Sequence, residues 1–175
     1  MAAAEKLSEF ETRLNVTYAT HDSVALAGDL YLPKGAGPFP ALVAVHGGGW
    51  VQGARNAFQY WGPWLAARGY AVFAISYRLA KTGQKTFPHA VQDVLAGIQY
   101  VRGNAKELNI APDRIGLFGH SAGGNLSALA ALGGSKFAGG YPNDPHAKVS
   151  TDVKVLAGLY GVYDVAHMWG VYNTQ

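Results

Sequence analysis

Arg114-Ile-Gly-Leu-Phe-Gly-His-Ser-Ala-Gly-Gly124 is the stretch of sequence on which the interpretation of the whole chain depends. Its apolar run, Ile115 to Phe118, is long enough to form a buried strand. Gly119 to Gly123 then matches the pattern G-x-S-x-G, and the small, leucine-bearing residues that follow up to Leu132 predict a helix. A strand that turns sharply into a helix, with serine at the turn, is a nucleophile elbow. We call residues 119–123 the elbow.

The chemistry of an elbow explains its residue types. The turn forces Ser121 into a strained backbone conformation, so its neighbours must be nearly free of side chains, and Gly119 and Gly123 supply that room. The turn also places the Ser121 hydroxyl at a helix N-terminus, where the helix dipole favours a developing negative charge. Because the chain holds 23 glycines in 175 residues, a chance match is the alternative, but the flanking strand and helix favour function.

A second motif, His46-Gly-Gly-Gly-Trp50, follows the apolar run Ala41 to Val45. Consecutive glycines let backbone N–H groups approach a ligand closely, which is how an oxyanion hole is built. We therefore predict that Gly48 and Gly49 donate two of these N–H groups and that Ala122, the residue after the serine, donates a third. A flexible glycine loop is the alternative. Two motifs, each at the end of a predicted strand, favour the oxyanion hole.

The remaining segments predict strands that alternate with helices. Further strands are predicted over 14–20, 24–32, 70–76 and 153–159, and helices over 56–68, 88–107 and 122–132, with a short helix within 2–11, a turn over 109–114 and a loop over 133–150. We expect a kink at Gly62-Pro63. This order indicates an α/β fold in one domain over residues 1–175, with an antiparallel pair first, then a largely parallel sheet with helices on both faces.

Composition excludes several classes of function. The 14 Lys and Arg are spread along the chain and the net charge is only +3, so no basic stripe for nucleic acid is present. The chain has no Cys, which excludes a disulfide framework, a thiolate metal site and a thiol nucleophile. It shows no signal peptide and no apolar run of membrane-spanning length, so we expect a cytoplasmic protein without membrane contact.

Four segments of the chain resemble those of a known family: His46–Trp50, Tyr77–Ala80, Ala111–Arg114 and Gly119–Gly124. They are similar to those of α/β-hydrolases of the hormone-sensitive-lipase-like esterase group, close to its carbohydrate-esterase-like relatives. The resemblance covers nearly the whole chain from about Leu14. It implies an α/β-hydrolase fold in which this chain contains strands one to six of eight and is truncated at its C-terminus.

The resemblance also implies roles for individual residues. Ser121 would be the nucleophile, and the N–H groups of Gly48, Gly49 and Ala122 would hold the oxyanion, with the N–H of Trp50 as an alternative to one glycine. No metal or organic cofactor is implied, and the chain contains no H-E-x-x-H, Walker A or G-x-G-x-x-G pattern.

Other conspicuous side chains are given structural or pocket-lining roles. Structural roles are predicted for two histidines beside the motifs, one helix aspartate and a Tyr-Arg pair: His46, His120, Asp93, Tyr77 and Arg78. We predict that Trp50 and Phe58 line the substrate pocket, with ordinary aromatic core as the alternative. For Trp61 and Trp64 we prefer the core.

The acid and the base of a serine hydrolase are not found in this chain. In this fold they follow the serine in the order Asp or Glu, then His, and the resemblance places both beyond the strand predicted over 153–159. The remaining candidates are Asp144, Asp152, Asp164, His146 and His167. None stands at a position that matches the family's acid or base. A substitute dyad that involves His167 is the alternative.

Three functions therefore stay open. The first is a serine hydrolase that cleaves small carboxylic esters through an acyl-enzyme, with the activity of these 175 residues alone in doubt. The second is a non-catalytic, hydrolase-like module for binding or assembly. The third is a formamidase or peptidase-type hydrolase of the same fold.

The strand predicted over 153–159 also carries an expectation about partners. By the family's strand order it would form an edge of the sheet, and it carries one charge, Lys154. Exposed apolar edges pair with further strands. We therefore expect a homo-oligomer, or a complementing chain, through this edge.

Overall fold

The computed structural model describes residues 7–137 and 140–168 and contains a six-stranded sheet with the order β1-β2-β4-β3-β5-β6. The strands are β1 (Phe10–His21), β2 (Val24–Pro33), β3 (Phe39–Val45), β4 (Ala71–Ile75), β5 (Ile110–His120) and β6 (Leu156–Leu159). The helices are α1 (Trp61–Ala66), α2 (His89–Gly103) and α3 (Ala122–Phe137), with a short 3-10 helix, η1, over Arg55–Phe58.

The first two strands form the predicted antiparallel hairpin. His21 pairs with Val24 across a two-residue turn, and both turn residues, Asp22 and Ser23, have positive φ angles of 49° and 65°. Such a turn matches the twist of the strands that it joins. β2 continues antiparallel to β4, whereas β4, β3, β5 and β6 run parallel, so their carboxyl ends meet at one edge of the sheet.

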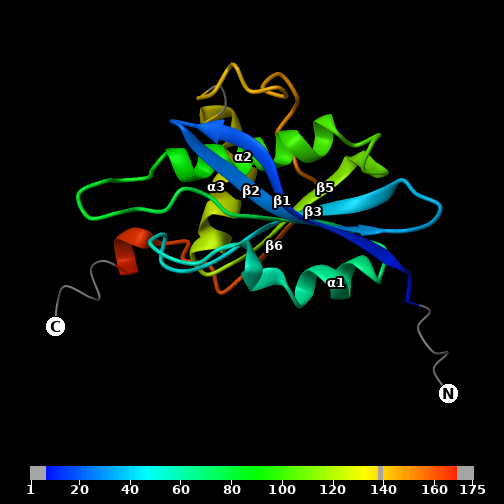
Figure 1. Cartoon of the computed structure of the whole chain (residues 1–175). Helices are drawn as coiled ribbons and strands as arrows, with labels where there is room; N and C mark the ends of the chain where they lie inside the picture. Colours follow the sequence, from blue (N-terminus) through cyan, green and yellow to red (C-terminus); the bar gives the residue numbers. More distant parts are fainter. Residues whose placement is uncertain (1–6, 138–139, 169–175) are drawn as a thin grey trace.

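Helices cover both faces of the sheet, as predicted. Figure 1 shows α2 and α3 on one face and α1 on the other. The central strands are buried on both sides, which explains their uninterrupted apolar sequences. On the α2 side, Val43, Phe73 and Leu117 join the main core, and on the α1 side Ala44 and Val72 pack in a smaller cluster.

Four predicted boundaries are corrected by the structure. The helix predicted over 56–68 is split into η1 and α1, and the break precedes Gly62-Pro63 because Pro63 is tolerated in a first helical turn. α2 ends at Gly103 rather than 107. Residues 110–114 belong to β5, since Ile110 pairs with Phe39 before a register shift. The strand predicted over 153–159 shortens to Leu156–Leu159.

Two further corrections concern α3 and the helix predicted near the N-terminus. α3 continues to Phe137, through Gly133 and Gly134, which were predicted to begin a loop. Glycine is tolerated inside a helix at a cost of about 1 kcal/mol, so these two residues do not end it. The helix predicted within 2–11 is wrong at its end because β1 begins at Phe10, and residues 1–6 lie outside the described part.

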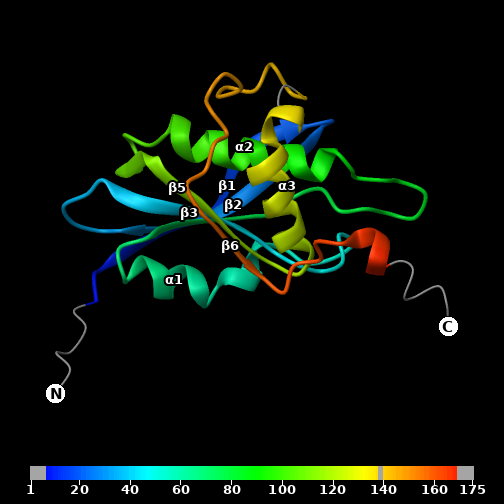
Figure 2. The ribbon, with the colours of Figure 1, turned by 180° about the vertical axis from the view of Figure 1, so that it is seen from behind.

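The last strand lies at an edge of the sheet. Within the described residues β6 pairs only with β5, and Leu159 is 42% exposed. Figure 2 shows β6 beside β5 and α3. The predicted edge position is therefore confirmed for this strand.

Candidate active site

Ser121 stands alone between β5, which ends at His120, and α3, which begins at Ala122. Its φ angle is 52°, in the left-handed region that costs a non-glycine residue about 1–2 kcal/mol. Two backbone hydrogen bonds hold it there. The Ser121 N–H donates to the Leu159 carbonyl at 3.0 Å, and the Asn125 N–H donates to the Ser121 carbonyl at 3.2 Å. The strained strand-turn-helix that the sequence predicts is present.

The elbow glycines allow the elbow to pack directly against the end of β3. A Cβ on Gly123 would lie 2.5 Å from the His46 carbonyl oxygen and would overlap that of Val45. A Cβ on Gly119 would lie 2.5 Å from the Gly123 carbonyl oxygen. Both glycines are therefore required by sterics, and their absence of side chains brings the two motifs together at one edge of the sheet.

Residues 46–50, which we call the glycine loop, follow β3. Gly48, Gly49 and Trp50 have positive φ angles of 123°, 59° and 64° in succession. The Gly48 carbonyl accepts the N–H groups of Val51 and Gln52 at 3.2 and 3.1 Å, which closes a tight turn. In the described residues no protein acceptor takes the N–H of Gly48 or Gly49. These two groups are available to a ligand.

The third predicted donor is at the start of α3. Ala122 is the first residue of this helix, and the first N–H groups of a helix have no partner within it. It is 1% exposed and directly follows the strained serine. The structure thus brings the three predicted oxyanion donors to the same end of the sheet.

The two histidines beside the motifs make structural contacts. The buried His46 donates from Nδ1 to the Gly47 carbonyl at 2.7 Å, and burial lowers its pKa. His120 Nε2 accepts the Gly47 N–H at 3.3 Å, and burial lowers the pKa of this ring as well. Both rings are therefore neutral near pH 7 and link the elbow to the glycine loop, as their predicted structural roles require.

A largely apolar cleft of about 770 Å³ lies beside α3. Trp50 lines it together with Phe87, Leu126, Leu129 and Tyr163. Ser121 is not among the lining residues, so the role of Trp50 in a substrate pocket stays a prediction. Phe87 and Tyr163 were not predicted to line a pocket, and neither carries a local signal in the sequence, because each reaches the cleft from a different loop.

Three aromatic predictions are corrected. Phe58 is 1% exposed, and the centroids of its ring and the Phe118 ring are 5.5 Å apart. η1 places it in the cluster on the α1 side of the sheet, so the prediction that it lines the pocket is wrong. Trp61 and Trp64, expected in the core, are 41% and 38% exposed on α1. The buried residues of α1 are Gly62 and Ala66, so the two indoles do not occupy the buried face of this helix.

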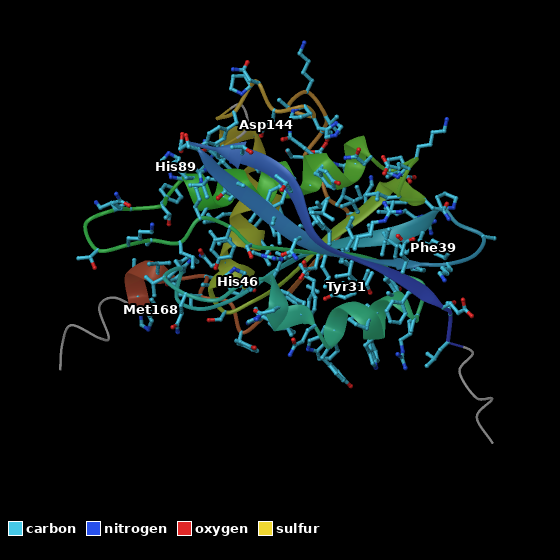
Figure 3. All side chains as sticks on the ribbon, in the orientation of Figure 1. Tyr31, Phe39, His46, His89, Asp144 and Met168 are labelled. Carbon is cyan, nitrogen blue, oxygen red and sulfur yellow. The ribbon has the colours of Figure 1, made fainter. Side chains whose placement is uncertain are left out.

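None of the five acid or base candidates forms a hydrogen bond with Ser121 among the described residues. Asp144 bonds His21, and Figure 3 shows Asp144 above α2, away from His46. Asp164 accepts the backbone N–H of His167 at 2.8 Å, so it caps the helical turn 165–168 rather than orienting an imidazole. Other contacts of these candidates join His146 to Asn104 and the Asp152 backbone to Arg102, both away from Ser121 in the hydrogen-bond pattern.

Two other kinds of site were sought in the described residues. No three His, Asp or Glu side chains there gather in a way that could hold a metal ion. None of the helices in residues 7–137 and 140–168 is both long and apolar enough to cross a bilayer.

The family model described as BD-FAE matches residues 28–174. The chain belongs to the BD-FAE family. This BD-FAE chain is 36% identical over 135 residues to esterase LipC of Mycobacterium tuberculosis, which covers 73% of this chain and 31% of that protein. It is 41% identical over 91 residues to an acetylxylan esterase of Xylanibacter ruminicola, which covers 51% of this chain and 18% of that protein. The BD-FAE chain thus spans about a third or less of these relatives.

Solved structures resemble the BD-FAE chain in fold. The esterase Est2 of the Planctomycetes species Thermogutta terrifontis matches with a TM-score of 0.72 and 27% identity, over 89% of this chain and 53% of that chain. That esterase has been solved with propionate bound, with butyrate bound and phosphonylated by sarin. A bacterial heroin esterase matches with a TM-score of 0.62 and 30% identity, over 77% of this chain and 42% of that chain. The predicted α/β-hydrolase fold is confirmed.

Proposed function

We propose that this chain is the nucleophile-bearing part of a carboxylesterase that cleaves small carboxylic esters through an acyl-enzyme. One observation carries the proposal: a strained serine, Ser121, stands at a strand-helix turn that packs on the glycine loop, where the N–H groups of Gly48 and Gly49 have no acceptor among the described residues. The names of the relatives, esterases in each case, support the same class of reaction.

The reaction would proceed in two steps. Ser121 Oγ attacks the ester carbonyl carbon and its proton passes to a base. The base returns this proton to the alkoxide oxygen as the C–O bond breaks, so the neutral alcohol leaves. Water then attacks the acyl-enzyme and releases the acid. In both steps the N–H groups of Gly48, Gly49 and Ala122 would stabilise the oxyanion. Removal of one such donor typically costs about 100- to 1000-fold in kcat.

The base and its orienting acid are proposed to come from residues outside this chain. No candidate among the described residues reaches Ser121. The greater length of the relatives supports a supply from a longer form of the protein, and the exposed edge of β6 supports a second copy or a complementing chain. We propose pairing through that edge. A stable monomer in size-exclusion chromatography with light scattering, at micromolar concentration, would contradict it.

The cleft and the relatives support a substrate class. The apolar cleft beside α3 would take the hydrocarbon part of a small ester, with Trp50 as one wall. Short acyl groups are supported by the propionate and butyrate bound to the Thermogutta terrifontis esterase. A cytoplasmic location without nucleic-acid or membrane partners stays a prediction.

Hydrolysis of p-nitrophenyl acetate tests the proposal. We expect turnover by a longer form of the protein, its loss in Ser121→Ala, and retention in Ser135→Ala, a matched control at an exposed position of the same helix. Turnover by residues 1–175 alone would overturn the proposal that the base comes from outside this chain. Absence of turnover in every form would overturn the proposed esterase function and favour a non-catalytic binding module.

A further inference from the structure

The short segment 77–80, which follows β4, is bonded to both ends of the glycine loop. The Tyr77 hydroxyl donates to the His46 carbonyl at 3.0 Å. The Ala80 N–H donates to the Trp50 carbonyl at 2.8 Å. These two bonds span the whole loop, from its first residue to its last, and neither belongs to the sheet.

The glycine loop needs such support. Gly48, Gly49 and Trp50 all lie in the positive-φ region, and Trp50 carries a Cβ that makes this conformation unfavourable. A strained conformation persists only where the surrounding structure restrains it. Since the N–H groups of Gly48 and Gly49 have no protein acceptor in the described residues, the restraint must come through the other groups of the loop.

The Tyr77 side chain is placed to act on the loop and on nothing in the cleft. It is 4% exposed, and its ring stacks on the His46 ring with centroids 4.3 Å apart and planes 15° apart. Burial raises the pKa of its hydroxyl far above the ordinary value. The hydroxyl therefore keeps its proton at neutral pH and serves as a hydrogen-bond donor.

The segment 77–80 is itself anchored from behind. The Arg78 N–H donates to Asp93 Oδ2 at 2.9 Å, and its guanidinium donates to Asp93 Oδ1 at 2.6 Å. Asp93 is fully buried on α2. Tyr77 thus rests on a fixed point in the core, which allows it to hold the loop rather than move with it.

We infer that Tyr77 is a positioning residue for the oxyanion hole. By fixing the His46 carbonyl it keeps the N–H groups of Gly48 and Gly49 directed toward the Ser121 side of the loop. The inference rests on the proposed esterase function for its catalytic consequence, but the restraint on the loop is a property of the chain itself. Tyr77 touches no reacting atom, so it is not a catalytic residue.

Tyr77→Phe tests the inference, and Tyr18→Phe is its matched control. Tyr77→Phe keeps the ring stack on His46 and removes only the hydroxyl. Tyr18 is buried to a similar degree, and its hydroxyl donates to the carbonyl of Ser76, the residue before Tyr77, at 2.8 Å. Among the described residues it makes no hydrogen bond to the glycine loop. The two variants therefore lose the same kind of bond at neighbouring places.

Amide hydrogen exchange by NMR supplies the first readout, on the 175-residue chain. The amides of Gln52 and Ala80 are followed because each donates to a glycine-loop carbonyl. We expect their exchange to rise about fivefold or more in Tyr77→Phe, as loss of one hydrogen bond predicts, and to be unchanged in Tyr18→Phe. Unchanged exchange in Tyr77→Phe, or an equal rise in both variants, would overturn the inference.

A kinetic split supplies the second readout, in a form of the protein that hydrolyses p-nitrophenyl acetate. We expect Tyr77→Phe to lower kcat about tenfold while KM stays within about twofold, because the oxyanion exists only in the transition state. An unchanged kcat would overturn the positioning role. If the wild-type protein hydrolyses no ester but the exchange result holds, the proposed function has failed and the restraint on the loop stands.

Discussion

The molecule contains two histidine sites that differ in chemistry. One lies at the elbow, and the other lies between the β1–β2 hairpin and α2. At the elbow, His46 and His120 are neutral rings that contact backbone groups. At the second site, His21 lies between two carboxylates. Its Nδ1 is 2.8 Å from Asp93 Oδ1, and its Nε2 is 2.7 Å from Asp144 Oδ2. The histidine-carboxylate geometry usually sought in a hydrolase thus lies away from the serine. The comparison teaches that such a pair signifies catalysis only where a nucleophile can reach it.

The second site, which we call the ionic cluster, consists of His21, Asp93, Asp144, Arg78 and Tyr141. A carboxylate only accepts hydrogen bonds, so a ring with a carboxylate at each nitrogen must donate from both and carry a positive charge. The Tyr141 ring stacks on the His21 ring, with centroids 3.5 Å apart, and the Arg78 guanidinium also binds Asp93. The cluster therefore ties the β1–β2 hairpin and α2 to the loop that contains Asp144.

Of the changes at the two sites, removal of the Asp93 side chain should lower the free energy of unfolding most. Asp93→Ala leaves the Arg78 and His21 charges without their buried partner, and we expect the free energy of unfolding to fall by about 3–5 kcal/mol. Asp22→Ala is the control, since Asp22 binds the same Arg78 with a side chain that is 62% exposed. Urea denaturation measures both. A small loss in Asp93→Ala would show that the ionic cluster does not stabilise the fold.

A methyl group at the elbow should give the next largest effect. In Gly123→Ala the new Cβ meets the backbone carbonyls of Val45 and His46, which cannot rotate away, and we expect a loss of about 1–3 kcal/mol in the free energy of unfolding. Gly133→Ala, in the same helix, meets only the Phe137 ring and should change stability by less than about 1 kcal/mol. Equal stabilities from urea titrations would show that the elbow does not pack tightly on β3.

The pH dependence of stability should have opposite signs at the two sites. Burial lowers the pKa of His21, but its bonds to Asp93 and Asp144 outweigh burial and raise the pKa above the ordinary value. Its stabilisation is then complete below about pH 6.5 and is lost as the pH rises through the raised pKa. Burial lowers the pKa of His120, so its contribution is present above about pH 6.5 and is lost as the pH falls through the lowered pKa.

Glutamine variants measure this contrast. The stability advantage of the wild type over His21→Gln should shrink as the pH rises from 5.5 to 9, whereas its advantage over His120→Gln should shrink as the pH falls over that range, by about 1 kcal/mol or less in either case. Urea midpoints at each pH provide the data. The same sign at both sites would remove the distinction between a charged and a neutral histidine.

The elbow and the glycine loop could be predicted from the sequence because local backbone geometry dictates their residue types. Only glycine fits where Gly119 and Gly123 meet backbone carbonyls, so the pattern survives in the sequence. The ionic cluster left no such signal, since His21 and Asp144 stand 123 positions apart. The burial of Phe58 and the exposure of Trp61 were missed for the same reason, because both depend on where η1 and α1 settle against the sheet.

The most direct test of the central claim is to map the site of reaction with a fluorophosphonate. A form of the protein that hydrolyses p-nitrophenyl acetate is treated with the reagent, digested and analysed by peptide mass spectrometry. We predict one adduct, on Ser121, which disappears in Ser121→Ala. An adduct on a different residue, or hydrolysis that survives in Ser121→Ala, would contradict the assignment of this strained serine as the nucleophile.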